Sequence, residues 1–272
     1  MNKIFVASLL LLVAALPAAG QGVPLGDLSS LSLPIVSGLL GDLTVGFEGA
    51  TGLSLLSLGA STQLIPPLDP GLRARLPDNV SISDCLPVLV RIVPPASGGL
   101  TFKGITNIEI RSLFAPAVPR VYAASSGGSF SDITSSILKS LDVAGGISYR
   151  VIGTEGGFSE FLVVSDPTPP ETVIAGKLDR LDQVLSANAG AINGTVLTDL
   201  SARLATVRGH AEGGDRAAAA QDLDLFLAAV TQHSGADVPD VWRAAGGVVN
   251  VAGQLRAAGE TLRFSLLQEL GQ

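Results

Sequence analysis

A short proline-rich segment divides this sequence into two parts with different residue patterns. The segment reads SDPTPPET, residues 165–172, and three of the four residues at 167–170 are proline. Proline lacks a backbone N–H and fixes its own φ, so such a run stiffens the chain and suits a connection between folded units. The sequence therefore predicts a β-domain over residues 21–166, a linker over 167–171 and a helical domain over 172–272.

The β-domain is indicated by short runs in which apolar and polar residues alternate. Leu43, Val45 and Phe47 alternate in DLTVGFEG, and LPVLVRIVPP is an apolar run that two prolines end. Such runs, separated by turn residues, predict an antiparallel β-sandwich. The EGG that joins ISYRVIGT to GFSEFLVVSD predicts a hairpin that pairs the last two strands.

Two stretches of the β-domain have an ambiguous pattern. LSSLSLPIVSGLLG, residues 28–41, is compatible with a helix or a strand, because its periodicity favours neither. DITSSILKSL, residues 132–141, is interpreted as one helical or 3₁₀ turn.

The helical domain shows apolar residues at the 3.6-residue period of a helix. The pattern predicts helices over 172–187 and 194–209, and a third within 213–235 that Asp215 caps. A fourth is predicted to start after Asp237, with Pro239 in its first turn, and to run to Leu255.

The last stretch, residues 260–270, either continues this fourth helix or begins anew after a break at Gly259. Short loops between such helices predict a small antiparallel bundle. The predicted fold class is α+β, with an antiparallel β-sandwich followed by this bundle.

The first 20 residues have the pattern of a Sec-type signal peptide. Lys3 precedes an apolar run at residues 4–16, and small residues follow in LPAAGQ. The alternative, a membrane anchor, is disfavoured because the run is too short to span a bilayer. No later segment reaches 18 continuous apolar residues, so no span is expected in the mature chain. The predicted location is the periplasm or the extracellular space.

The sequence offers few residues for chemistry. His210, His233 and Cys85 are the only soft metal ligands, which makes a structural zinc site improbable. Both histidines fall near predicted helix ends, where an imidazole favours the helix dipole, and no G-x-S-x-G motif is present. Glu155 and Glu160 are interpreted as surface charges. We therefore predict no catalytic, cofactor-binding or metal-ligating residue and no cofactor.

The net charge of −7 and the lack of a basic face argue against a nucleic-acid partner. A protein partner is instead predicted for the helical domain. Gly246 and Gly253 stand seven residues apart on the predicted fourth helix, and small side chains on one face would allow a partner to approach closely.

The segment from LTDLSARLATV to VVNVAGQL, about residues 195–258, resembles the FIMAH-type helical domain of exported bacterial proteins. Its pattern is a leucine-rich helix, a short glycine turn, an Ala-rich helix with LDLFLAAV and SG, and a further Ala-rich helix. The resemblance implies an accessory or interaction module without enzyme activity.

GSFSDITSSI and ISYRVIGTEGGFSEFLVVSD are similar to the closing strands of secreted β-sandwiches and of ZU5-like domains. Some ZU5-type domains cleave themselves between Phe and Ser with help from a preceding His. Here Phe158 and Ser159 are present, but Gly157 stands in the place of the His, so self-cleavage is not expected. As a whole, the chain resembles secreted bacterial proteins of uncharacterised function.

These observations favour an exported, non-catalytic protein that serves as a binding or structural module at the cell envelope or outside the cell. One alternative is an exported hydrolase with a site in the β-domain loops. Another is a surface protein that assembles with itself, which would account for the mean hydropathy of +0.47.

Overall fold

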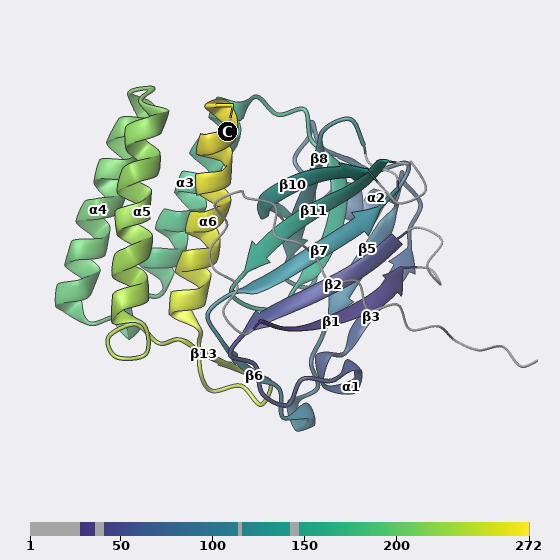
Figure 1. Ribbon diagram of the computed structural model, residues 1–272, viewed down its shortest axis with the longest axis horizontal. Coiled ribbons are helices and arrows are strands. Elements are labelled where there is room, and N and C mark those ends of the chain that lie inside the picture. The colour runs from purple at the N-terminus through teal and green to yellow at the C-terminus, as the bar shows by residue number, and fades with distance from the viewer. Residues whose placement is uncertain (1–27, 36–40, 114–115, 142–146, 272) are drawn as a thin grey trace, which may run out of the picture.

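The computed structural model describes residues 28–35, 41–113, 116–141 and 147–271 (Figure 1). The predicted signal peptide, residues 1–20, lies outside the described residues. The described chain forms two packed β-sheets followed by four long helices, so the predicted α+β fold class is confirmed.

The first sheet contains five antiparallel strands in the order β1-β2-β7-β11-β10. The ambiguous stretch at its edge is a strand: β1 pairs along its whole length with β2. The strands are β1 (Leu28–Ile35), β2 (Gly41–Glu48), β7 (Thr106–Ser112), β10 (Thr134–Leu141) and β11 (Ile147–Glu155).

The second sheet has the order β3-β5-β12-β8-β9, with β4 beside β12. Its strands are β3 (Ala60–Leu64), β4 (Ser81–Ile82), β5 (Val88–Ile92), β8 (Pro119–Ala124), β9 (Ser131–Asp132) and β12 (Glu160–Ser165). The short helices α1 (Leu55–Leu58) and α2 (Pro70–Arg73) and the 3₁₀ turn η1 (Ala96–Gly98) lie in its connections.

The core of the sandwich lies between the two sheets. The alternating residues Leu43, Val45 and Phe47 of β2 are fully buried there, as the sequence predicts. They pack in one cluster with residues of the second sheet, including Phe161. Burial of each such large side chain contributes about 1.5–3 kcal/mol, so the alternation fixes which face of each strand points inward.

Two sequence predictions in this part were wrong. The residues predicted to form a β11–β12 hairpin belong to different sheets: β11 pairs with β7 and β10, whereas β12 pairs with β4, β5 and β8. Residues 132–141 are the strands β9 and β10, because β10 finds backbone partners along β11. A short apolar pattern does not reveal which distant strand will form backbone hydrogen bonds with a segment. The local patterns therefore predicted a wrong strand pairing in the first case and a wrong secondary structure in the second.

The C-terminal part contains α3 (Pro170–Ala187), α4 (Gly194–Glu212), α5 (Arg216–His233) and α6 (Val251–Glu269), with a 3₁₀ turn η2 (Ala189–Ala191). The first three helices confirm the prediction to within a few residues. Asp215 caps α5 by accepting a hydrogen bond from the backbone N–H of Ala218, at 3.0 Å. The helices bury one shared apolar cluster, in which Leu181, Leu200 and Phe226 are completely covered.

The predicted fourth helix was wrong in its first half. Val241–Arg243 instead form a strand, β13, which pairs with β6 (Thr101–Lys103) in a separate two-stranded sheet. Gly246 and Gly247 follow with φ of +76° and +83°, a left-handed conformation that interrupts a helix and suits glycine. Asn250 then caps α6, which continues unbroken through Gly259.

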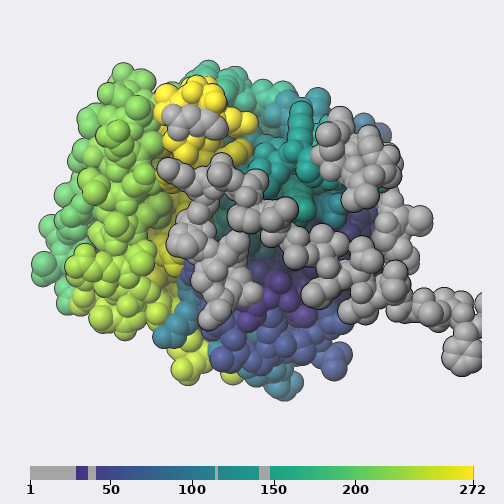
Figure 2. Space-filling view, viewed as in Figure 1, coloured from purple at the N-terminus to yellow at the C-terminus, as the bar shows by residue number. Residues whose placement is uncertain are grey.

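Helix α6 lies between the helices α4 and α5 and the sandwich, whereas α3 contacts the sandwich directly (Figure 1). In the space-filling view, α6 is the yellow layer between the green α4 and α5 and the teal strands (Figure 2). At its first turn a Cβ on Gly253 would overlap the carbonyl oxygen of Gly104. Gly253 therefore faces the chain's own sandwich, and Gly246 is not helical. The predicted glycine face for a partner does not exist.

Candidate functional site

The chain crosses from the second sheet to the first between β9 and β10, and this crossing lies under the helices. Asp132 ends β9, Ile133 is fully buried, and Thr134 begins β10. The backbone N–H of Thr134 donates to Asp132 Oδ1 at 2.7 Å, which fixes the orientation of the carboxyl group. Here the sandwich presents the carboxyl group of Asp132 and the backbone carbonyl oxygen of Thr134 to α3 and α6.

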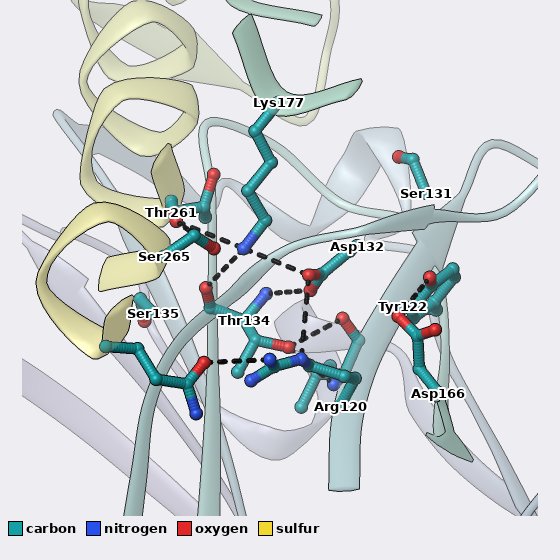
Figure 3. A network of polar contacts seen from close by, with 12 residues as sticks. Arg120, Tyr122, Ser131, Asp132, Thr134, Ser135, Asp166, Lys177, Thr261 and Ser265 are labelled. Carbon is teal, nitrogen blue, oxygen red and sulfur yellow. Dashed lines mark hydrogen bonds and ion pairs between the residues drawn. The ribbon is translucent and has the colours of Figure 1, made fainter. Parts of the chain in front are cut away.

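Lys177 of α3 enters this crossing from the helical side (Figure 3). Its side chain is 3% exposed, and its Nζ lies 3.0 Å from Asp132 Oδ2. The same Nζ donates to the carbonyl oxygens of Thr134, at 3.1 Å, and Thr261 of α6, at 3.0 Å. Burial lowers the pKa of Lys177, and the charge of Asp132 opposes that shift.

Arg120 of β8 completes the charged group from the second sheet. Its guanidinium lies over the Phe264 ring of α6, and Nη2 donates to Gln268 Oε1 at 2.8 Å. Its Nε is 3.9 Å from Asp132 Oδ2. Nε and Nη1 are buried and make no hydrogen bond with any residue that the structure describes. We call Arg120, Asp132, Thr134, Lys177 and Thr261 the polar junction.

A second buried pair lies beside the polar junction. Tyr122 donates from its hydroxyl to Asp166 Oδ2 at 2.8 Å, and Asp166 Oδ1 accepts from the backbone N–H of Thr168. Burial, with the nearby charges of Asp132 and Asp166, raises the pKa of Tyr122, so its phenol stays neutral and donates. This contact anchors the start of the proline-rich segment to the sandwich.

Sequence reasoning missed the polar junction, although Lys177 carries a detectable signal. Ile174, Leu178 and Leu181 form the buried stripe of α3, and Lys177 falls within that stripe at helical spacing. A lysine inside an apolar stripe is rarely buried without a partner. The sequence around Asp132 and Arg120 does not indicate that these two residues are buried, because their burial depends on the docking of the helices.

The residues that the sequence singled out lie elsewhere. His210 Nδ1 is 2.7 Å from Asp222 Oδ2, and His233 Nδ1 is 2.8 Å from Asp237 Oδ2. Both histidines occupy the last turn of a helix, as expected. Cys85 lies in the loop before β5, where its Sγ is 3.2 Å from Ser83 Oγ. None of them belongs to the polar junction.

The interpretation of Glu160 as a surface charge was wrong. Glu160 is 7% exposed and lies between Arg75, whose Nη2 is 2.6 Å from Oε2, and Arg91, whose Nε is 2.7 Å from Oε1. Burial opposes ionisation of this carboxyl, but the two arginines outweigh it and hold its pKa below the usual value. Glu155 forms an ion pair with Arg180 of α3 at 2.7 Å.

A pocket of about 290 Å³ lies at the base of the helices, away from the polar junction. It is lined by Ala191, Val248 and five residues of the segment 235–240 together with Val241. Among the described residues, no group of three or more His, Cys, Asp or Glu side chains is placed to hold a metal ion.

The fold and the polar junction define the class: an α+β protein whose antiparallel β-sandwich and helical bundle are joined through buried charges. The chain belongs to a family of unknown function, DUF6689, whose family model matches residues 8–269. No curated protein matches the chain. None of the helices in the described part of the chain has both the length and the apolar character to cross a membrane.

Proposed function

We propose that this protein is exported and acts as a non-catalytic binding module, with residues 1–20 as its signal peptide. It would work in the periplasm or outside the cell. The observation that carries the binding function is Leu56 of α1, which is 88% exposed although the helix around it is well built. Ser54 and Ser57 form a reciprocal capping box at the start of α1, so this helix presents Leu56 in a fixed position.

Further exposed apolar side chains continue from α1 along the edge of the second sheet. Val93 is 70% exposed, and its backbone N–H donates to the carbonyl oxygen of Gly59, which places it beside the end of α1. Leu64 and Leu68 are exposed at the other end of β3. Exposed apolar residues grouped in this way mark interaction surfaces more often than isolated ones do.

Strand β3 itself offers backbone groups to a partner. Among the described residues it pairs with β5 alone, and its sequence, ASTQL, contains neither charge nor proline. The carbonyl oxygen of Gly59 accepts from the N–H of Val93, and the N–H of Ile65 donates to the carbonyl oxygen of Pro87, so both groups point toward β5. By the alternation of an antiparallel ladder, the backbone groups of Ala60, Thr62 and Leu64 point to the open side. We infer that the partner is an extended protein segment that adds a strand to β3 and packs apolar side chains on Leu56 and Val93.

Other parts of the proposal rest on the sequence. The resemblance of the helical part to the FIMAH-type domain favours an accessory or interaction module, and that of the sandwich to ZU5-like domains favours an exported protein. The alternative of an exported hydrolase stays a prediction, and no arrangement among the described residues of the β-domain loops favours it.

The test compares two edge variants with a matched control in the native host. Leu56→Lys places a charge on the exposed apolar surface of α1. Thr62→Pro removes a backbone N–H that points to the open side of β3 and keeps the hydrogen bonds between β3 and β5. The control is Leu225→Lys, at an exposed leucine of α5 that lies away from the β3 edge. Proteins cross-linked to the wild type are identified by mass spectrometry. We expect both edge variants to lose a partner that the control retains; the same partners on all three would contradict the proposal.

A further inference from the structure

We propose that Lys177 and Asp132 form an intramolecular isopeptide bond, an amide between Nζ and Cγ that fastens α3 covalently to the sandwich. The two side chains are 3% and 8% exposed, and Nζ lies 3.0 Å from Oδ2 (Figure 3). They are adjacent in space because α3 docks over the crossing between β9 and β10. This modification is independent of the binding function proposed above.

The amine is oriented as a nucleophile. Its hydrogens are directed at the carbonyl oxygens of Thr134 and Thr261, which lie on one side of Nζ, while Asp132 lies on the other (Figure 3). Among the described residues Asp132 Oδ2 has no hydrogen-bond partner, and its contact with Nζ is an ion pair at 3.0 Å. In a neutral amine, two N–H bonds that kept these two hydrogen bonds would leave the lone pair on the side of the carboxyl group. The buried surroundings favour this neutral form, which is the reactive form of lysine.

The carboxyl group is held as an electrophile. As Nζ adds to Cγ, negative charge develops on Oδ1, and the Thr134 N–H already donates to that atom at 2.7 Å. Arg120 adds a buried positive charge whose Nε is 3.9 Å from Oδ2, and whose Nε and Nη1 have no hydrogen-bond partner among the described residues. Donors placed in advance around developing charge lower the barrier to acyl transfer.

The reaction is a condensation that needs no other reagent. Within the ion pair, one ammonium proton passes from Nζ to Oδ2, which leaves an amine beside a carboxylic acid. The amine then attacks Cγ, the Nζ–Cγ bond forms and the Cγ–Oδ2 bond breaks. One Nζ proton joins the departing Oδ2–H, and water leaves. Confinement raises the effective concentration of the two groups to about 10⁵ M or more, and the product replaces two buried charges by one neutral amide. The remaining amide N–H donates to Thr134 or Thr261.

The cross-link would supply a covalent constraint that cysteine cannot provide. Cys85 is the only cysteine, so an internal disulfide is impossible. An isopeptide between residues 132 and 177 would close a loop that contains β10, β11 and β12. Closing such a loop restricts the unfolded chain, as a disulfide does.

The test is mass spectrometry of the folded wild-type protein, which does not depend on whether any variant folds. We expect an intact mass about 18 Da below that calculated for the same chain without its signal peptide, the loss of one water. Trypsin should then release residues 121–139 joined to residues 151–180 as one branched peptide, because a modified Lys177 resists cleavage. Lys177→Met should restore the full mass, whereas the control Lys139→Met, at an exposed lysine of β10, should keep the loss.

Separate peptides 121–139 and 151–177 from wild-type protein of unaltered mass, after days of incubation in the folded state, would overturn the proposal. So would a loss of 18 Da that fragmentation places at another aspartate, because a succinimide produces the same change.

Discussion

Arg256 of α6 forms a two-pronged ion pair with Glu48 at the end of β2, with Nη1–Oε2 and Nη2–Oε1 distances of 2.6 and 3.0 Å. The two residues are 208 positions apart, and the bond joins the last helix to the second strand. The pairing of β13 with β6 and the polar junction are two further contacts of this kind. Together the three contacts hold the C-terminal part of the chain against the β-domain.

Loss of the Arg256–Glu48 pair should destabilise the fold. In Arg256→Met, Glu48 and Glu260 would stay close together without the cation between them. We expect the free energy of unfolding to fall by about 2 kcal/mol, as for a partly buried, charge-assisted contact. Urea denaturation measures the change. The control is Arg203→Met, whose pair with Asp199 is exposed on α4 and should contribute less than about 0.5 kcal/mol; equal effects would contradict this assignment.

Glu260 should make the stability depend on pH near neutrality. Burial, assisted by Glu48, raises its pKa from 4.5 to about 7, against the attraction of Arg256 and Arg263. The folded state therefore binds an extra proton between these values, so this contribution to stability is fully present below pH 4.5 and is lost as the pH rises through 7.

Replacing Glu260 with glutamine should remove that dependence and raise the free energy of unfolding at pH 8 by about 2 kcal/mol. Thermal unfolding of both proteins from pH 4.5 to 8 provides the comparison. A wild-type curve that runs parallel to the Glu260→Gln curve over this range would show that Glu260 ionises normally.

Gly253 should tolerate no side chain. A Cβ there would overlap the carbonyl oxygen of Gly104 and the side chain of Asn250, whose Nδ2 donates to Gly104 and Gly156 across the same contact. We expect Gly253→Ala to cost about 1–3 kcal/mol, because the helix must shift away from the sandwich. Gly176→Ala is the matched control on α3, where the added methyl group meets open space and should stabilise the helix by up to about 1 kcal/mol. Destabilisation by both substitutions would point to a general intolerance of helical glycines.

Trp242 should report on the cooperativity of the whole chain. It is the only tryptophan, and from β13 it packs on Phe102 and Phe158 at ring distances of 5.3 and 4.7 Å. If the helices and the sandwich unfold together, Trp242 fluorescence and far-ultraviolet circular dichroism should give the same urea midpoint. Two separated transitions would instead support independent domains on either side of the linker predicted at 167–171, a division that stays a prediction.

The helices show how far local patterns reach. α3, α4 and α5 were predictable because each carries an apolar stripe at helical spacing, and α5 also carries its cap at Asp215. The same kind of pattern also predicted a helix across Val241–Arg243, because apolar residues continue through that segment. That segment is a strand because β6 supplies its backbone partners and Phe102 packs on Trp242. Nothing local to residues 237–250 carries that information except the glycine pair at 246–247.

The polar junction, by contrast, could not be predicted from local patterns. A buried lysine could be suspected from the stripe of α3, but its partners Asp132 and Thr134 lie more than 40 residues earlier, in a segment that the sequence suggested was a helical turn. The sequence by itself determined the fold class, the extents of α3, α4 and α5 to within a few residues, and the inward face of β2, because these follow from periodicity and the burial of apolar side chains. The tertiary structure alone decided which sheet each strand joins, where α6 begins and which charges become buried, because these depend on contacts between residues far apart in the chain.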